Sequence, residues 1–294
     1  MPRTAVRLLP LAAVVAAGAA ALVACAPADD TAGSAASGSG ATTTDCSPSS
    51  LKTLTSGTFT FGTDQPVYEP WFVDDKPESG QGFESAVAYA VAEQLGYAKD
   101  DVTWTRVTFN AAIAPGPKKF DADINEFSIT DERKQAVDFS APYYDVTQAV
   151  VSLNSGKAAG VTDLAGLKDL KLGAQVGTTS YSAITDVIKP TQSPSVFNTN
   201  DDAKAALTNG QIDALVLDLP TAFYTTSAEL DDAKIVGQLP QTSGTPEQFG
   251  MVLDKGSSLT SCVSKAVDAL RSDGTLDKLV DQWLSQAGSA PELS

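Results

Sequence analysis

Apolar residues follow helical and strand-like spacing in turn along most of the chain from residue 58 onward. Phe83, Val87, Val91 and Leu95 recur every four residues, and Gly96 follows them, which predicts an amphipathic helix that ends at the glycine. Apolar runs predict strands at residues 58–63, 102–107, 121–127, 149–153, 170–176, 214–217, 235–239 and 249–253. We expect further helices at residues 163–167, 180–188, 200–207, 258–270 and 276–283, with Asn200 as one N-cap. This alternation predicts the α/β fold class.

Residues 1–24 have the order of residue types found in an export signal. Arg3 and Arg7 precede an uncharged stretch at residues 8–24 that is rich in Ala, Leu and Val. A transmembrane anchor is the alternative. No basic stop-transfer group follows the stretch, however, and many of its residues are Ala or Gly. We therefore expect residues 1–24 to be a signal peptide.

The uncharged stretch ends in the letters LVAC, and the final cysteine is Cys25. This ending resembles a lipobox, the bacterial lipoprotein site at which the cysteine is lipidated and becomes the first residue of the mature protein. Ala, Ser, Thr and Gly dominate the following segment, which has almost no large apolar residue. Residues 25–50 are therefore expected to form a lipidated N-terminus and a flexible tether.

Two cysteines, Cys46 and Cys262, remain on the outer side of the membrane after export. In an oxidising compartment they most simply form a disulfide, and two buried free thiols are the alternative. A bridge would stabilise the fold by about 3 to 5 kcal/mol in the chain-entropy model. It would also return the C-terminal helices to the N-terminal part of the fold. We then expect one lobe at residues 51–149 and 245–288, an inserted second lobe at 150–244, and two chain crossings that form a hinge.

Composition narrows the function further. The 294 residues are enough for two domains. The net charge of −16 argues against sequence-independent binding of nucleic acids, and removal of the two signal-peptide arginines makes it −18. The chain has no histidine, which excludes Ser-His and Cys-His nucleophile pairs, an imidazole base and His-ligated zinc. No Walker loop, G-x-G-x-x-G motif or nucleophile elbow occurs in the folded region, so neither a cofactor nor a metal is expected.

One acidic segment fits part of a calcium-loop template. Asp121, Asp123, Asn125 and Glu132 match its ligand positions, but Glu126 stands where the template needs a glycine for the turn. The segment is better explained as a strand.

Polar residues at predicted strand-to-helix turns are the candidates for ligand binding, because α/β lobes open their sites there. Arg133 shares such a turn with Ser128 and could bind a carboxylate with two parallel hydrogen bonds. Its alternative is a solvated helix residue. The Gly-Thr-Thr-Ser run at 177–180 could bind an anion or simply cap a helix. Asp218 could pair with an ammonium or cap a helix near Leu219.

Short motifs follow one another in order through the folded region: GTD at Gly62 with Pro70, GFE at Gly82, FDAD at Phe120, SITDER at Ser128, VDFS at Val137, GTTS at Gly177 and DGTL at Asp273. Together they resemble the polar amino-acid family of extracytoplasmic solute-binding proteins, the substrate receptors of ABC importers. The resemblance covers about residues 52–286. It implies a two-lobed, periplasmic-binding-protein-like (Venus flytrap) fold with a central sheet in each lobe, whose cleft closes on one amino acid.

The same resemblance implies roles for individual residues. Arg133 would bind the α-carboxylate with help from Ser128 and Thr178, and Asp218 would receive the α-ammonium. Trp71 is expected near the mouth of the cleft. The remaining implied site residues form aromatic walls or face the amino group and side chain of the ligand; they are Tyr68, Phe109, Asp64, Asn125, Glu126 and Ser180.

Two departures from the family pattern bear on the ligand. Many members have a small residue in place of Glu126, and an aspartate common in the family is replaced by Ala86. With Asp64 and Glu69 nearby, Glu126 favours a ligand with a positive end, such as arginine or lysine. A neutral polar amino acid such as glutamine would fit equally well if the acid meets only the α-ammonium or the other lobe. Acidic ligands are least favoured because these carboxylates would repel them.

The resemblance further implies a monomer, anchored by its lipid to the extracytoplasmic face of the cell membrane, that delivers a free amino acid to an ABC permease and is not an enzyme. Two other functions on the same fold stay open. One is a ligand-sensing receptor. The other is an enzyme similar to cyclohexadienyl dehydratases, with Asp64, Glu126 or Asp218 as general acid or base.

Overall fold

The computed structural model describes residues 45–241, 244–285 and 290–294. The predicted signal peptide, Cys25 with its lipobox, and most of the predicted tether lie outside these residues. Within the described ranges, no helix is long and apolar enough to cross a membrane.

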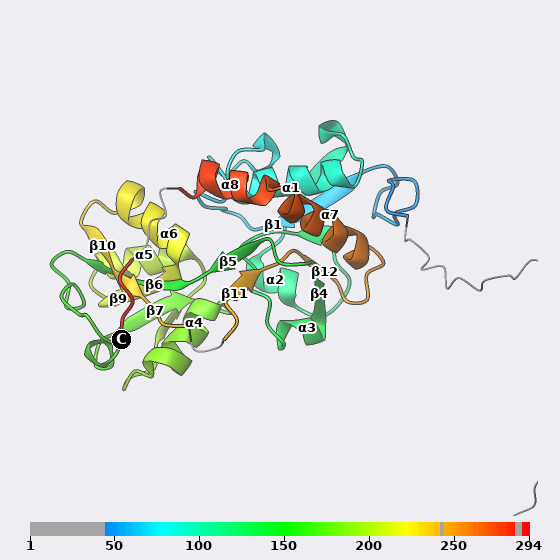
Figure 1. Ribbon diagram of the computed structural model, residues 1–294. Coiled ribbons are helices and arrows are strands. Elements are labelled where there is room, and N and C mark those ends of the chain that lie inside the picture. The colour runs from blue at the N-terminus through cyan, green and yellow to red at the C-terminus, as the bar shows by residue number, and fades with distance from the viewer. Residues whose placement is uncertain (1–44, 242–243, 286–289) are drawn as a thin grey trace, which may run out of the picture. The chain divides into compact units, whose positions relative to one another are not determined.

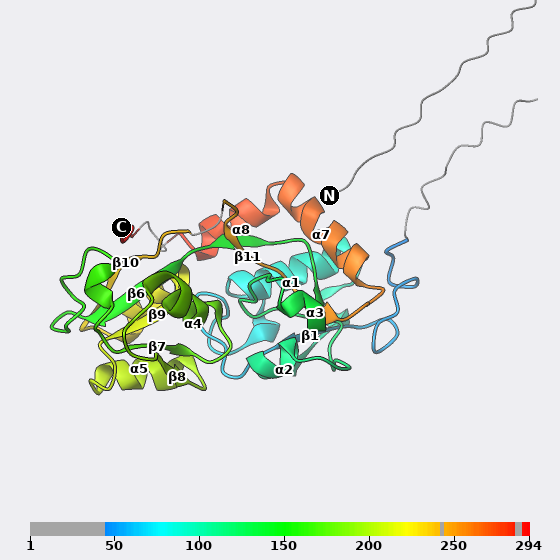
Figure 2. The same cartoon turned by 90° about the horizontal axis from the view of Figure 1, so that it is seen from below.

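The first lobe is built on a five-stranded sheet in the order β2-β1-β3-β12-β4. Its strands are β1 (Phe59–Thr63), β2 (Val102–Arg106), β3 (Ala122–Asp123), β4 (Val137–Phe139) and β12 (Val252–Asp254). The first three are parallel, and β12 runs antiparallel to both of its neighbours. Helices α1 (Phe83–Gln94), α7 (Thr260–Ser272) and α8 (Thr275–Trp283) pack on one another beside this sheet, whereas α2 (Phe109–Ile113) lies on the opposite side (Figure 2). Short helical segments complete the lobe: Pro77–Ser79, Lys99–Asp101 and α3 (Arg133–Ala136).

The second lobe has its own five-stranded sheet, in the order β10-β6-β9-β7-β8. These strands are β6 (Gln148–Leu153), β7 (Leu172–Gln175), β8 (Ser195–Phe197), β9 (Ala214–Asp218) and β10 (Ala233–Gln238). The helices of this lobe are α4 (Thr179–Ala183), α5 (Asn200–Thr208) and α6 (Leu219–Tyr224). Single helical turns occur at Ala165–Leu167, Ile184–Ile188 and Thr225–Glu229. The mixed α/β fold with two sheet-containing lobes confirms the predicted fold class.

A separate antiparallel pair of strands joins the lobes, β5 (Tyr144–Val146) and β11 (Glu247–Phe249). Figure 1 shows this pair between the elements of the two sheets. The chain leaves the first sheet through β5 and returns through β11, so these strands are the two predicted crossings.

Residues at alternate positions of the second sheet enter different cores. Val150 of β6 and Val216 of β9 pack in one hydrophobic cluster, whereas Val151 and Leu215 pack in another. Successive side chains of a strand point to opposite faces, so both faces of this sheet are covered. This explains why β6 and β9 consist of nearly continuous apolar residues.

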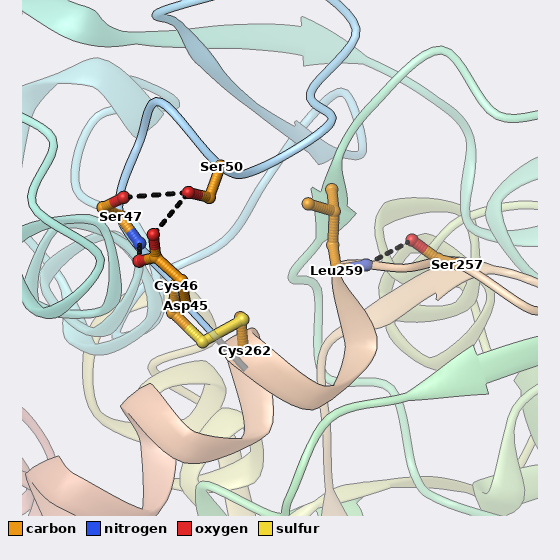
Figure 3. The surroundings of a disulfide bond; sticks show 7 residues. All are labelled: Asp45, Cys46, Ser47, Ser50, Ser257, Leu259 and Cys262. Carbon is orange, nitrogen blue, oxygen red and sulfur yellow. Dashed lines mark hydrogen bonds between the residues drawn. A yellow bond between two sulfur atoms is a disulfide. The ribbon is translucent and has the colours of Figure 1, made fainter. Parts of the chain in front are cut away.

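The structure contains the predicted disulfide between Cys46 and Cys262, which joins the start of the described chain to α7 (Figure 3). The Asp45 carboxylate accepts hydrogen bonds from the Ser47 amide at 2.9 Å and the Ser50 hydroxyl at 2.5 Å. Cys262 itself is 1 % exposed within the first-lobe core. The bridge thus fastens the end of the predicted tether to that core.

Several predicted element bounds were wrong. Residues 249–253 do not form one strand, because the chain changes from β11 to β12 at Gly250, where an added Cβ would lie 2.8 Å from the Ile129 side chain. The N-cap of α5 is Thr199, whose hydroxyl accepts the amide of Asp202 at 3.1 Å, and not Asn200. The predicted helix at 163–167 is a single turn.

The described C-terminal residues return to the second lobe, which the sequence analysis did not predict. Leu293 is 1 % exposed in the core beneath β10, and the Gln238 amide donates to the Pro291 carbonyl at 2.9 Å. An added Cβ at Gly237 would lie 2.7 Å from Leu293, so glycine leaves the room that the tail occupies. The tail therefore covers the outer edge of β10, which ends the sheet (Figures 1 and 2).

We expect the double substitution Cys46→Ser and Cys262→Ser to lower the free energy of unfolding by about 3 to 5 kcal/mol. The bridge closes a loop with a sequence separation of 216, and its loss enlarges the unfolded ensemble. Urea unfolding followed by circular dichroism measures the change. An unfolding free energy equal to that of the wild type, with free thiols absent from the wild type, would contradict the expectation.

We expect Leu293→Ala to lower the free energy of unfolding by about 2 to 4 kcal/mol, because the truncation leaves a cavity in the second-lobe core. The same urea titration measures it. Leu54→Ala is the matched control, since Leu54 is 57 % exposed and its truncation should change little. Equal effects of the two truncations would refute the packing role of the tail.

Candidate functional site

A small cavity lies between the two lobes. Its walls are formed by Asp64, Pro66, Tyr68, Phe109, Asn125, Glu126, Gln175, Thr178, Thr179, Asn200 and Asp218. Seven residues of the predicted ligand set are among them. The other three adjoin the wall: Ser128 and Ser180 lie next to Thr179, and Arg133 lies against Phe109.

Arg133 occupies the first position of α3, where the Thr130 hydroxyl accepts its backbone amide at 3.1 Å. Its guanidinium donates to the carbonyl of Ser128 at 2.7 Å and, across the lobes, to the carbonyl of Gly177 at 2.9 Å. The guanidinium carbon lies 5.3 Å from the centre of the Phe109 ring. Arg133 is 9 % exposed, so it is not the solvated helix residue considered as the alternative.

No carboxylate of the described residues forms an ion pair with Arg133 within 4 Å. Burial lowers the pKa of the guanidinium, and the negative charges of Glu247 and Asp218 oppose that shift. A guanidinium has five N–H donors, and two of its nitrogens are bonded to carbonyls here. It therefore retains the capacity to bind an anionic group.

Ser128 lies where the two lobes meet. Its hydroxyl donates to Glu247 Oε1 at 2.5 Å and is 3.1 Å from the Thr179 hydroxyl of the second lobe. Because a hydroxyl has a single proton, Thr179 is the donor in that second contact. Glu247 of β11 thus occupies a hydrogen bond that Ser128 could otherwise give to a ligand.

The turn at residues 177–180 performs the helix-capping role considered as an alternative. The Thr178 hydroxyl accepts the amide of Tyr181 at 3.3 Å and donates to the Gln175 carbonyl at 2.7 Å. Ser180 donates its hydroxyl to Gln148 Oε1 at 2.7 Å. Capping positions both residues beside the cavity.

Two aromatic residues, Tyr68 and Phe109, line the cavity. Phe109 stacks on Phe127 with ring centres 4.7 Å apart. The Tyr68 ring lies 5.0 Å from Nζ of Lys204, a second-lobe residue that also pairs with Glu229 at 2.6 Å. The Phe109 wall is packed within the first lobe, and the Tyr68 wall contacts the second lobe.

The first-lobe part of the cavity is held by Asp64, whose carboxylate accepts the amides of Gln65 at 2.7 Å and Phe109 at 3.2 Å. Burial raises the pKa of Asp64, and these bonds oppose the shift. Asn125 is 9 % exposed and accepts a long hydrogen bond of 3.5 Å from the Thr63 hydroxyl. Both residues line the cavity.

Glu126 and Asp218 approach the cavity from different lobes. Burial raises the pKa of Glu126 well above its ordinary value, and the charges of Asp218, Glu84 and Asp64 raise it further. Burial and then the charge of Glu247 raise the pKa of Asp218 well above its ordinary value. Like charges confined in one small space favour the neutral acids or a bound cation.

Behind Glu126 lies a second layer of buried acid. Glu84 Oε1 accepts the Glu126 amide at 2.7 Å and a short hydrogen bond from the Tyr143 hydroxyl. Burial raises the pKa of Glu84 to about 7, although these two bonds oppose the shift. Asp123 is fully buried, neither carboxylate oxygen has a hydrogen-bond partner among the described residues, and burial raises its pKa well above the ordinary value.

The residues that connect the acids to the hinge were not predicted from the sequence. The side-chain amide of Gln148, at the start of β6, donates to Asp218 Oδ1 at 2.6 Å and to Glu247 at 3.2 Å, so it joins the crossing strand β11 to the cavity. The missed wall residues are Pro66, Gln175, Thr179 and Asn200. A buried glutamine at the start of an apolar strand was the available signal.

Trp71 is not near the mouth of a cleft, in contrast to the prediction. It is fully buried and packs against the rings of Phe83, Tyr144 and Phe249. Only its indole N–H reaches the second lobe, where it donates to the Thr221 hydroxyl at 2.7 Å.

Comparison with known proteins identifies the chain's relatives. The sequence profile described as "Bacterial extracellular solute-binding proteins, family 3" matches residues 59–286. The "L-arginine-binding protein" of Pseudomonas aeruginosa is 30% identical over 244 residues, which cover 77% of this chain and 90% of that protein.

Two solved structures are similar in fold and sequence. One, "An ancestral arginine-binding protein bound to glutamine", superposes with a TM-score of 0.65 at 32% identity, covering 77% of this chain and 97% of that one. The other, "the ancestral amino acid-binding protein AncCDT-1, a precursor of cyclohexadienyl dehydratase", gives a TM-score of 0.63 at 31% identity, covering 78% of this chain and 95% of that one.

We expect Glu84→Gln to reduce the pH dependence of stability between about pH 4.5 and 7. The pKa of Glu84 is raised in the folded state to about 7, so the native protein holds a proton that the unfolded chain releases. This contribution to stability is fully present below the unfolded pKa and is lost as pH rises through the folded pKa, by about 3 kcal/mol. The neutral amide cannot titrate.

Urea titrations at pH 4.5 and pH 7.5 measure this change. In this variant the unfolding free energy should still depend on pH with the same sign, because the buried acids Asp123, Glu126 and Asp218 remain. Glu93→Gln, at an exposed position of the same helix, is the control. If the unfolding free energy of Glu84→Gln changes between the two pH values as much as that of the wild type does, the expectation is contradicted.

Proposed function

The chain belongs to the bacterial extracellular solute-binding proteins of family 3, and we propose that it captures a free amino acid with a positive side chain and delivers it to an ABC permease. The observation that carries the proposal is the separation of charge around the cavity. The buried guanidinium of Arg133 lies at one side, and the carboxylates of Asp64, Glu126 and Asp218 line the cavity.

A zwitterionic amino acid matches this separation. In the proposal its α-carboxylate meets Arg133, Ser128 and Thr178, and its α-ammonium meets Asp218. A guanidinium that has no carboxylate partner among the described residues supports the first contact. Charge-assisted bonds of this kind contribute roughly 1.5 to 3 kcal/mol each. Closure of the lobes completes the site, because neither lobe alone holds all of these groups.

The remaining acids select the side chain. Asp64 and Glu126 lie in one lobe and would face a guanidinium or ammonium group of the ligand, with Tyr68 and Phe109 as apolar walls; Asn125 and Ser180 would supply neutral hydrogen bonds. The P. aeruginosa relative is named for L-arginine, which agrees with this choice. The ancestral protein solved with glutamine keeps a neutral polar ligand as the alternative.

The rest of the proposal concerns cellular context. Lipidation of Cys25 would anchor the protein to the extracytoplasmic face of the membrane, with residues 25–50 as a tether and residues 1–24 removed as a signal peptide. One lobe would comprise residues 51–149 and 245–288, and the other residues 150–244. We propose that the monomer works with a membrane permease and uses no cofactor.

Catalysis is the second candidate, and one observation favours it. AncCDT-1, which is similar in fold, is described as a precursor of cyclohexadienyl dehydratase. The raised pKa of Glu126 would suit a general acid. Turnover of prephenate or arogenate by the purified protein would establish the enzyme, whereas stoichiometric binding of an unchanged amino acid supports the receptor. Loss of arginine uptake in cells that lack the gene would separate transport from sensing.

We expect L-arginine to bind the purified protein more tightly than L-glutamine, and L-glutamate to bind least. Isothermal calorimetry measures the dissociation constants. Arg133→Ala should weaken the binding of every amino acid by about 2 to 5 kcal/mol, since it leaves the α-carboxylate of the ligand without its partner. Glu126→Gln should weaken L-arginine while L-glutamine is retained.

Glu132→Gln is the matched control, because Glu132 is an exposed neighbour of Arg133. Its dissociation constants should equal those of the wild type. If no amino acid binds the wild type, the proposed function is wrong. If L-glutamine binds more tightly than L-arginine, only the preference for a positive side chain is wrong.

A further inference from the structure

Thr221 connects the two lobes beside the cavity. It lies in α6 of the second lobe, three residues after Asp218, and is 5 % exposed. Its hydroxyl accepts the indole N–H of Trp71 at 2.7 Å and is 2.9 Å from Oε2 of Glu126. Trp71 and Glu126 both belong to the first lobe. One hydroxyl therefore joins two first-lobe side chains to a second-lobe helix.

The direction of this chain of hydrogen bonds is fixed by its chemistry. An indole nitrogen can only donate, so the Thr221 oxygen accepts from Trp71. The single hydroxyl proton is then free to point at Glu126 Oε2, which accepts it. Among the described residues, Thr221 is the only side chain that forms a hydrogen bond to this carboxyl group.

Both residues at the ends of this series of hydrogen bonds, Trp71 and Glu126, are held firmly. Trp71 is fully buried among aromatic rings whose centres lie 5.6 to 5.9 Å away, so its N–H cannot turn toward another acceptor. Glu126 has a left-handed backbone with φ of 54°, and its amide donates to Glu84 Oε1 at 2.7 Å. Glu84 thus fixes the backbone of Glu126, which leaves the direction of its carboxyl group to Thr221.

The charges around Glu126 explain why such a contact is needed. The negative charges of Asp64, Asp218 and Glu84 act against the ionised form of Glu126 and raise its pKa, beyond the larger effect of burial. Thr221 offsets part of this repulsion at one oxygen, and the side chain still lines the cavity. Because Thr221 moves with Asp218 on the same short segment, the contact exists only when the second lobe lies against the first.

We propose that Thr221, held by the Trp71 indole, is a positioning residue for ligand selection: it directs the Glu126 carboxylate toward the positive end of the ligand when the lobes close. This inference rests on the proposed function. It adds that the preference for a positive ligand depends on a neutral hydroxyl that the ligand does not touch.

Three variants test the proposal. Thr221→Val removes the hydroxyl with little change of shape, Thr221→Ser restores it, and Trp71→Phe removes the indole donor. We expect Thr221→Val to weaken the binding of L-arginine by roughly 10-fold or more and that of L-glutamine much less. Most of the loss for L-arginine should appear as faster dissociation in stopped-flow measurements. Thr221→Ser should restore both the affinity for L-arginine and its slow dissociation. In a Glu126→Gln background, Thr221→Val should have no further selective effect.

Thr226→Val is the matched control, since the Thr226 hydroxyl bonds only to backbone carbonyls of its own helix, at 3.0 and 3.3 Å. In this variant the ratio of the dissociation constants for L-arginine and L-glutamine should equal that of the wild type. An equal loss of L-arginine and L-glutamine in Thr221→Val would overturn the selective role. Failure of Thr221→Ser to restore binding would do the same.

A measurement that needs no bound amino acid separates this inference from the proposed function. The indole N–H resonance of Trp71, assigned by its loss in Trp71→Phe, should exchange slowly with solvent in the wild type and Thr221→Ser, and faster in Thr221→Val. The resonances of Trp104 and Trp283 serve as internal references. If the wild type binds neither amino acid, the proposed function fails, and unchanged indole exchange in Thr221→Val would independently refute the contact.

Discussion

The buried guanidinium of Arg133 is the constraint around which the rest of the site is arranged. A charge removed from water needs compensating partners, because its desolvation costs several kcal/mol. The structure supplies carbonyl oxygens from both lobes and places the negative charges of Glu247 and Asp218 farther away. This arrangement stabilises the cation while leaving it able to bind a carboxylate. It also means that any anion bound there lies against a lobe boundary.

The acids of the site are tied to the hinge by hydrogen bonds. Gln148 belongs to β6, directly after the first crossing, and Glu247 to the second crossing strand, and the glutamine side chain joins Glu247 to Asp218. Gln148 and Asp218 are register partners in the second-lobe sheet, so the bond from Gln148 to Glu247 links the carboxylate that would meet an α-ammonium to the second crossing strand.

Sequence patterns predicted the fold class and the disulfide, because each leaves a local signature, whereas most of the candidate site residues were implied by the resemblance to a family. Alternating spacing marks the elements, and two extracytoplasmic cysteines mark a bridge. The missed features depend on contacts between distant segments. Nothing in the local sequence around Trp71 predicts that its ring enters a core while its N–H reaches the other lobe. Nothing near Leu293 in the sequence predicts that it packs beneath β10. Element ends were missed where one residue decides them, as Thr199 does for α5.

Because the chain has no histidine, the pH dependence of the charge of the site rests on its carboxylates. Asp64, Glu126 and Asp218, which line the cavity, each have a pKa raised chiefly by burial, so the charge of the site changes with pH without an imidazole. A positive ligand group lowers those pKa values again, since an opposite charge favours the ionised form. The α-ammonium of any amino acid would act in this way on Asp218, and a positive side chain would in addition favour proton release from Asp64 and Glu126. The number of protons released on binding would thus differ between a ligand with a positive side chain and one with a neutral side chain.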